Sequence, residues 1–115
     1  MRRALLVTPL VIVAGCGVAR VDVSTLAGDW HGRIVTPRGQ TAARLTVGAD
    51  GRYEGTAFFD DLDQPVRGTI VALPSGHLRY VGNAGEGTVD VDDGMLRFRG
   101  DDGATGGRFR RADDR

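Results

Sequence analysis

Few side chains in this chain of 115 residues could serve as a nucleophile or a general base. Its only histidines, His31 and His77, are 46 positions apart, and Ser75 lies in a Pro-Ser-Gly stretch that predicts a turn. Ser75 lacks the pattern of a nucleophile elbow, and no serine–histidine–acid triad can be assembled. His31 follows Trp30, so strand alternation predicts that its ring is solvated. We therefore predict no catalytic residues and no enzyme activity.

Aspartate clusters are the next possible source of chemistry, as cation ligands. Asp90-Val91-Asp92-Asp93-Gly94 is similar to the start of a calcium loop. Glycine, however, falls at the third ligand of that loop, and Asp101 takes the place of its closing glutamate. Asp60-Asp61-Leu62-Asp63 and Asp101-Asp102 also fall at predicted turns, where aspartate bonds nearby N–H groups. With no metal-binding histidine spacing either, the sequence predicts no metal site and no cofactor.

Cys16 is the only cysteine, and it ends an apolar stretch that follows Arg2 and Arg3. The run Val13-Ala14-Gly15-Cys16 resembles the lipobox of bacterial lipoproteins. That resemblance implies cleavage between Gly15 and Cys16 and attachment of a diacylglyceryl group to the thiol. Two or more acyl chains hold a protein firmly on a bilayer. We therefore expect a membrane anchor at Cys16, a thiol unable to act as a nucleophile, and no disulfide.

Two alternatives to this anchor remain open, a retained transmembrane span and a plain secreted protein. A span needs about 20 apolar residues, whereas Ala4 to Ala19 provides 16 with Pro9 inside. The lipoprotein resemblance implies a cell-envelope location. Gly17, in place of an aspartate after the cysteine, resembles lipoproteins sorted to the outer membrane of Gram-negative bacteria.

The remaining 100 residues are enough for one small domain. All 15 basic residues of the chain are arginine, and the part after residue 15 has 13 arginines against 15 acids. This balance argues against nucleic acid as a partner, because nucleic acid needs a strongly basic domain. We expect a signal peptide over 1–15, a lipidated N-terminus and linker over 16–27, a domain over 28–111 and a tail over 112–115.

From Trp30 onward the apolar residues recur with a period of two, which is typical of half-buried antiparallel strands. The 18 glycines also disfavour helix. The predicted strands cover residues 30–36, 41–48, 52–60, 65–73, 77–82, 87–92, 95–101 and 104–110. Their expected inner face includes Trp30, Ile34, Leu45, Tyr53, Ile70, Ala72 and Leu96.

The predicted turns keep these apolar residues on one face. Asp93-Gly94 and Asp102-Gly103 suit two-residue turns, and Ala49-Asp50-Gly51 and Pro74-Ser75-Gly76 suit three-residue loops with glycine at positive φ. These turns would pair Val91 with Leu96, Leu96 with Phe109, Val47 with Tyr53, and Ala72 with Leu78. Four-residue loops over 37–40, 61–64 and 83–86 would pair Ile34 with Ala43, Phe59 with Val66, and Tyr80 with Val89.

Eight antiparallel strands joined by hairpins predict an up-and-down meander. Closure into a barrel would remove both sheet edges, and a two-layer sandwich is the alternative. Glycines at 32, 55, 68 and 82 would let the strands coil sharply. Phe58, Val71 and Val81 are expected to face outward.

Gly28-Asp29-Trp30 at the start of the first strand, followed by a meander, resembles the lipocalin and calycin superfamily. The resemblance implies that Trp30 plugs one barrel end beneath an arginine from the last strand, with Arg108, Arg110 or Arg111 as candidates. The chain is shorter than most lipocalins, so no activity is carried over.

Three functions remain possible at this stage. The first is a lipid-anchored envelope protein that acts by binding or association. The second is a lipocalin-like carrier of a small apolar ligand, and the third is a protease inhibitor or another protein-binding module. An interior void of roughly 300 Å³ or more would favour the carrier, whereas a filled core would favour protein partners.

Overall fold

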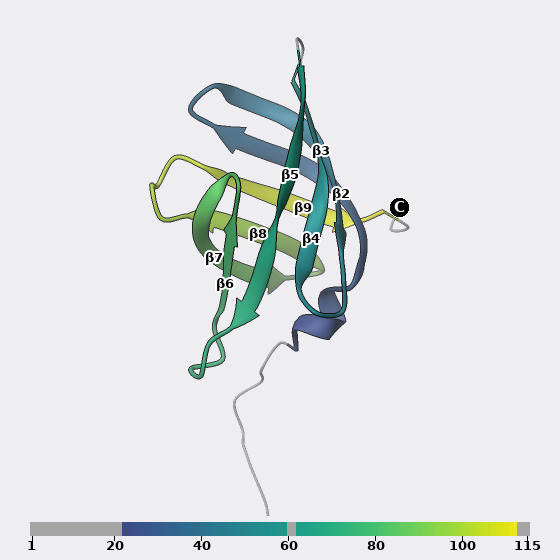
Figure 1. The fold of residues 1–115 in the computed structure, drawn as a ribbon, viewed down its shortest axis with the longest axis vertical. Helices are drawn as coiled ribbons and strands as arrows, with labels where there is room; N and C mark the ends of the chain where they lie inside the picture. The colour runs from purple at the N-terminus through teal and green to yellow at the C-terminus, as the bar shows by residue number, and fades with distance from the viewer. Residues whose placement is uncertain (1–21, 60–61, 113–115) are drawn as a thin grey trace, which may run out of the picture.

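A computed structural model of the protein describes residues 22–59 and 62–112. The expected signal peptide, Cys16 and residues 113–115 lie outside the described residues. A short 3₁₀ helix, η2 (Val23–Leu26), precedes eight strands (Figure 1). The strands are β2 (Gly28–Thr36), β3 (Gly39–Val47), β4 (Arg52–Phe59), β5 (Leu62–Ala72), β6 (Leu78–Gly82), β7 (Gly85–Asp92), β8 (Met95–Gly100) and β9 (Gly106–Arg111).

The eight strands form a closed antiparallel barrel in which each strand pairs with its neighbours in sequence. The barrel closes where β2 pairs with β9, with Gly32 opposite Phe109. The predicted up-and-down barrel is therefore confirmed, and the two-layer sandwich is wrong. Closure gives both terminal strands a partner along the ladder, which removes edges that could pair with other chains.

The strand pairs whose predicted turns contain Asp-Gly or a glycine at positive φ have the predicted registers. Val91 is opposite Leu96, Leu96 is opposite Phe109, Val47 is opposite Tyr53, and Ala72 is opposite Leu78. Asp93 and Gly94 both have positive φ, at 54° and 76°, as a two-residue type I′ turn requires. Gly51 and Gly76 also have positive φ, as the three-residue loops predicted.

The three predicted four-residue loops are wrong. The strands extend further than predicted, and only two residues remain in each connection. Ile34 is opposite Thr41, Phe59 is opposite Leu62, and Tyr80 is opposite Gly87. Gly39 and Gly85, the first residues of the returning strands, have φ of 120° and 114°. A side chain at either position would have free space, so glycine is needed there for its backbone conformation. Each register shifts by an even number of residues, which leaves the two faces unchanged.

The predicted inner face forms the core. Trp30, Leu45, Tyr53, Ile70 and Leu96 are buried, and Leu96 is 0% exposed. Ala72, which the pattern placed on the same face, is exposed at the end of β5. Phe58, Val71 and Val81 lie outside, as predicted, with 36%, 42% and 56% of their surface exposed.

Gly32 and Gly55 allow neighbouring strands to approach closely. A Cβ at Gly32 would overlap the carbonyl oxygen of Arg108 on β9, and one at Gly55 would overlap that of Arg44 on β3. Strong strand coiling in a small barrel produces such contacts. The prediction that central glycines permit coiling is confirmed at these positions.

Candidate functional site: a barrel with one closed end and one open mouth

Trp30 and Arg111 close the end of the barrel that lies next to η2. Trp30 is 2% exposed, and its indole Nε1 donates a hydrogen bond to the carbonyl oxygen of Leu26 at 2.8 Å. The Arg111 guanidinium lies over the indole, 4.5 Å from the ring centroid. Its two terminal nitrogens donate to the carbonyl oxygens of Ala27 and Thr25. One arginine thus covers the tryptophan and caps the last turn of η2.

Strand register explains why Arg111 occupies this position. Arg111 is directly opposite Trp30 in the β2–β9 pair, so both side chains point to the same side of the sheet. The other two candidate arginines, Arg108 and Arg110, are exposed on the outer face of β9.

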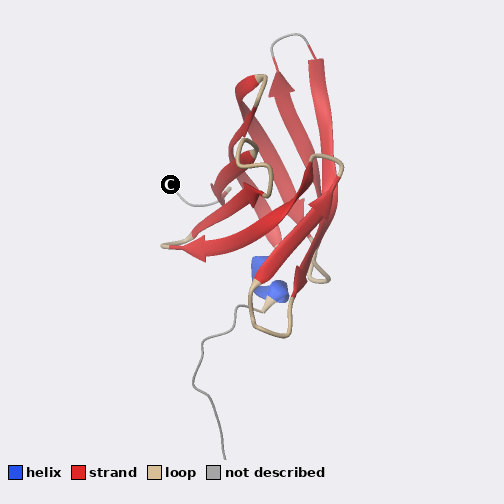
Figure 2. Ribbon diagram, turned by 90° about the vertical axis from the view of Figure 1, so that its left-hand side faces the viewer, coloured by secondary structure: helices blue, strands red, loops and turns tan. Residues whose placement is uncertain are grey.

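Residues 23–27 also belong to the barrel domain, although the sequence predicted a linker through Ala27. Leu26 is 2% exposed in the core, and Val23 packs against the core from outside. Figure 2 shows η2 beneath the strands at this end. Val23 and Leu26, two apolar residues close together, were a sequence signal for docking of this segment. An analysis that looks only for a period of two does not detect it.

The opposite end of the barrel is an open mouth. A cleft of about 420 Å³ lies between the β2–β3, β4–β5, β6–β7 and β8–β9 connections. Its lining is mostly apolar and includes Ile34, Phe59, Pro65, Val66 and Ala84. At its rim the Arg38 guanidinium lies 5.0 Å from the centroid of the Phe59 ring. The mouth therefore presents aromatic and aliphatic groups beside a cation.

The interior between the two ends is nearly filled by aromatic rings. Phe98 makes edge-on contacts with Tyr53, Tyr80 and Phe109, with ring centroids 5.6, 5.0 and 5.7 Å apart. The remaining interior cavity has a volume of about 40 Å³. It shares Ile34, Val66, Ala84 and Thr105 with the mouth cleft. The cleft thus continues inward only a short way before it meets the aromatic cluster.

The two tyrosines are poor candidates for acid–base chemistry. Burial, and secondarily the charge of Tyr80, raises the pKa of Tyr53 to about 12. Burial also raises the pKa of Tyr80. Both phenols therefore remain neutral near pH 7. The Tyr53 hydroxyl lies beside Gly68 and Gly82, where a Cβ on either residue would overlap it.

The histidines and Ser75 do not form a catalytic group. His31 is exposed on the outside of β2, and His77 is exposed after the β5–β6 turn. The Ser75 hydroxyl accepts a long hydrogen bond, 3.4 Å, from the backbone N–H of His77. Within residues 22–59 and 62–112, no group of three or more His, Cys, Asp or Glu side chains is placed to hold a metal ion.

Several aspartates of the predicted turns are engaged by arginines and backbone groups, and Asp60 and Asp61 lie outside the described residues. Arg97 forms ion pairs with Asp90 at 3.2 Å and with Asp92 at 3.5 Å. Asp102 accepts hydrogen bonds from the backbone N–H of Ala104 and from both groups of Thr105, and these bonds lower its pKa. These contacts are consistent with turn and cross-strand roles.

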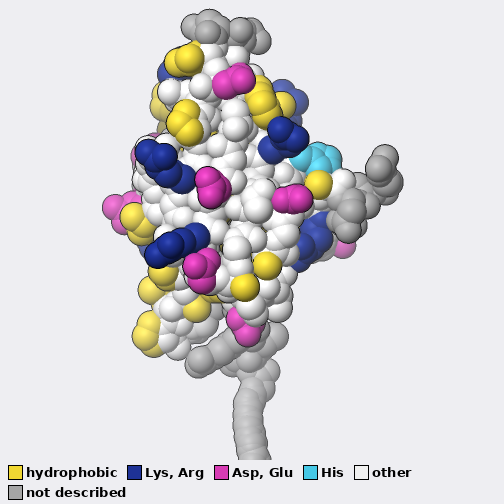
Figure 3. All heavy atoms as spheres, turned by 45° about the vertical axis from the view of Figure 1, so that its right-hand side comes forward, with side chains coloured by type: hydrophobic (Ala, Val, Ile, Leu, Met, Phe, Trp, Pro, Cys, Tyr) yellow, Lys and Arg dark blue, Asp and Glu magenta, His cyan; other side chains and the backbone are white. Residues whose placement is uncertain are grey.

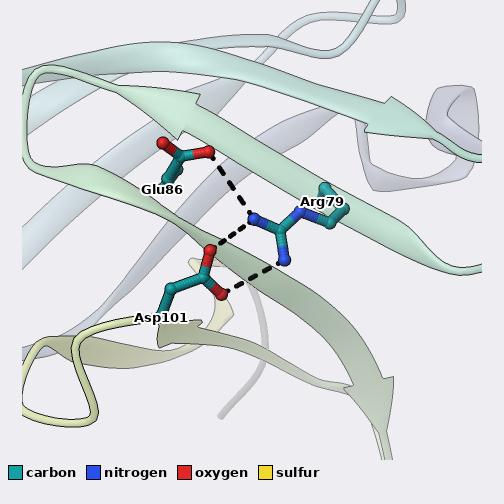
Figure 4. A network of polar contacts seen from close by, with 3 residues as sticks. All are labelled: Arg79, Glu86 and Asp101. Atoms are coloured by element: carbon teal, nitrogen blue, oxygen red, sulfur yellow. Dashed lines mark hydrogen bonds and ion pairs between the residues drawn. The ribbon is translucent and has the colours of Figure 1, made fainter.

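Arg79 joins two further carboxylates near the mouth (Figure 4). Its two terminal nitrogens bond both oxygens of Asp101, and Glu86 lies 3.6 Å away. The hydrogen bonds from Arg79 lower the pKa of Asp101. The sequence did not predict this cluster, because the expected register of β6 and β7 was two residues out. Figure 3 shows the same kind of mixed surface, with arginine and acidic side chains interspersed among single apolar ones.

Comparisons with family models, with curated proteins and with solved structures found no significant match to this chain. Among the residues that the structure describes, no helix is long and apolar enough to cross a bilayer.

Proposed function

We propose that this protein is a lipid-anchored module of a bacterial cell envelope that works by binding a protein partner at its open mouth, without catalysis. The observation that carries the proposal is the difference between the two ends. One end is closed by Trp30, Arg111 and η2, whereas the other holds a cleft of about 420 Å³ that is lined mainly by apolar residues. Clefts of about 490 and 350 Å³ elsewhere on the barrel are lined largely by polar and charged residues. The lipobox-like run ending at Cys16 supports the anchor.

The position of η2 supports an arrangement in which the closed end is tethered close to the membrane and the mouth is not covered by it. Asp22, where the described chain begins, is six positions after Cys16. A segment of this length reaches about 20 Å when fully extended. A lipid on Cys16 would therefore keep the closed end close to the bilayer and leave the mouth accessible to other envelope components.

The interior volume favours a protein partner over a small-ligand carrier. Pockets for small molecules typically enclose about 300–1,000 Å³, and the interior cavity measures about 40 Å³. The mouth cleft, at about 420 Å³, reaches that range but is an open surface cleft that fits a few side chains of a partner. Arginine and aromatic residues, here Arg38 beside the partly buried Phe59 ring, are enriched at protein interfaces. The contact of Arg111 with Trp30 supports the resemblance to calycins at the level of architecture, and a ligand is not implied by it.

Mass spectrometry of the membrane-associated protein tests the anchor. We expect the native product to begin at Cys16 and to carry acyl chains, and the Cys16→Ser variant to lose them. A native product that is soluble and unmodified would end the lipoprotein hypothesis.

Site-specific photocrosslinking in cells tests the mouth. A photoreactive residue in place of Phe59 should give a discrete crosslinked product, whereas one in place of Val81, on the outer wall, should not. Identical products from both positions would argue against a partner at the mouth. The carrier alternative predicts instead that the purified protein retains a small apolar compound detectable by native mass spectrometry.

A further inference from the structure

Four arginines and one histidine lie in two adjacent rows on the outer wall formed by β9, β2 and β3. In one row, Arg110 of β9 is opposite His31 of β2, which is opposite Arg44 of β3. In the next row, Arg108 of β9 is opposite Arg33 of β2. All five side chains are exposed. These five residues are called the arginine face below.

The arginine face contrasts with the opposite wall. Among the described residues that point outward from β2, β3 and β9, Asp29 is the only acid, and it accepts a hydrogen bond from the Thr46 hydroxyl. The wall formed by β4–β7 mixes both signs with an excess of acid: Glu54, Asp63, Glu86, Asp90 and Asp92 against Arg52, Arg67 and Arg79. A chain with a formal net charge of zero is thus polarised across the barrel.

Packing explains only part of the arginine face: the Arg44 guanidinium lies over the Phe58 ring, 5.8 Å from its centroid. Like charges at directly opposite positions of neighbouring strands destabilise a sheet, because their Cβ atoms are only about 4.5–5.5 Å apart. Arg33 gains one hydrogen bond, from its Nε to Gln40 at 3.3 Å, and exposed uncharged residues would fit the same positions. An anionic surface over the two rows would offset the repulsion among the arginines and would attract their guanidinium groups.

The row of His31, Arg44 and Arg110 lies in the half of the barrel nearer the tethered end, and the row of Arg33 and Arg108 lies near the middle of β2 and β9. His31 and Arg33 are three and five residues from Gly28, where β2 begins beside η2, or about 10 and 17 Å along the strand. Arg110 immediately precedes Arg111, which covers the closed end. A lipid on Cys16 would thus hold these cations within reach of headgroups.

We propose that the arginine face binds the phosphates of anionic phospholipid headgroups and so orients the barrel on the membrane. The planar guanidinium forms paired hydrogen bonds with phosphate oxygens, and two adjacent rows of cationic side chains allow contact with several headgroups at once. The acidic wall of β4–β7 would then be turned away from the negative surface. The proposal rests on the proposed function for the closeness of the bilayer, but its test does not require a lipid on the chain.

The test is binding of residues 16–115 carrying Cys16→Ser to vesicles, measured by co-sedimentation. All described contacts fall within residues 22–112, so this chain retains the complete barrel. One variant combines Arg33→Gln and Arg108→Gln on the arginine face. The matched control combines Arg52→Gln and Arg67→Gln on the opposite wall, which removes the same charge.

We expect binding to vesicles that contain phosphatidylglycerol at low salt, and loss of binding at 1 M salt or on phosphatidylcholine alone. Each arginine near an anionic membrane contributes about a fivefold gain in partitioning, so the first variant should bind about 25-fold more weakly. The control should change by less than about threefold. Circular dichroism would verify that each variant is folded. Arg44→Gln combined with Arg110→Gln serves as a second test pair.

Failure of the unmodified chain to bind anionic vesicles would overturn the membrane assignment, whatever mass spectrometry shows at Cys16. Equal losses in the test pairs and the control would show that overall charge governs binding, and would also overturn it. Binding of an acidic polypeptide that depends on Arg33 and Arg108, in the absence of any vesicle binding, would assign the face to an acidic protein instead.

Discussion

The closed end and the open mouth of the barrel differ in how completely their side chains are engaged. At the closed end, the Trp30 indole and the Arg111 guanidinium both bond backbone carbonyls of residues 25–27. At the mouth, Phe59 and Leu62 lie at the end of the β4–β5 hairpin, and Leu62 is 56% exposed. The first arrangement contributes to stability, whereas the second leaves apolar surface available. One end of the barrel thus has side chains that stabilise the fold, and the other has the free apolar surface that the proposed binding role requires.

Removal of the Trp30 side chain should give the largest effect and break the closed end. Trp30→Ala deletes a ring that is 2% exposed and should lower the free energy of unfolding by about 3–5 kcal/mol. Phe59→Ala, at the mouth, should lower it by about 1 kcal/mol because that ring is only partly buried. Urea denaturation measures both. Equal losses would mean that the two ends contribute alike to stability.

Arg111→Met should sharpen the comparison at the level of a single charge. The variant keeps an unbranched apolar side chain but loses the cation over Trp30 and two hydrogen bonds to carbonyls, so we expect a loss of about 2 kcal/mol. Arg108→Met on the same strand is the control. Its side chain faces Arg33 and Arg97 across the ladder, so its removal should be neutral or slightly stabilising. A larger loss from Arg108→Met would contradict the assigned roles.

Particular residues show why the barrel was predictable and the mouth was not. Asp93-Gly94 and Gly51 encode their turns locally, through residues that accept positive φ, and the alternation of apolar residues determines which face is buried. Gly39 and Gly85 also encode turns, but the same sequences tolerate either a two-residue or a four-residue connection with the same faces. Strand continuation, which adds ladder hydrogen bonds, selects the shorter connection.

The candidate site depends on residues that come together only in three dimensions. The mouth combines Ile34, Phe59 and Ala84 from three hairpins, and no local pattern marks them as neighbours. The Trp30–Arg111 contact was partly predicted, because the lipocalin resemblance had named Arg111 as one of three candidate arginines from the last strand. Docking of Leu26 was missed because η2 has only four residues, too few to show a helical period in the sequence.

The aromatic cluster between the two ends should make the barrel sensitive to high pH. The pKa of Tyr53 is raised to about 12 in the folded protein, so the unfolded chain releases this proton first, at about pH 10. Stability should therefore fall as pH rises from about 10 to 12, by roughly 2 kcal/mol for this residue. Tyr53→Phe should reduce this loss, with Tyr80 accounting for the remainder. Urea titrations at pH 8, 10 and 11.5 measure it, and parallel curves for variant and native chain would contradict the assignment.

The smallest effect is expected from Asp101→Asn, which tests whether polar contacts near the mouth matter for folding. Hydrogen bonds from Arg79 hold the pKa of Asp101 below its usual 3.8, so its contribution is present above about pH 4 and is lost as pH falls through the lowered pKa. The exposed pair is screened by solvent, so the native chain should lose only slightly more stability than the variant on acidification. Thermal melts between pH 7 and pH 2.5 at low salt compare the two, and Asp63→Asn, at an exposed aspartate of β5, controls for the lost charge. If Asp101→Asn destabilised the barrel as much as Arg111→Met, the mouth would be as firmly held as the closed end, and the division between a stabilising end and a binding end would not stand.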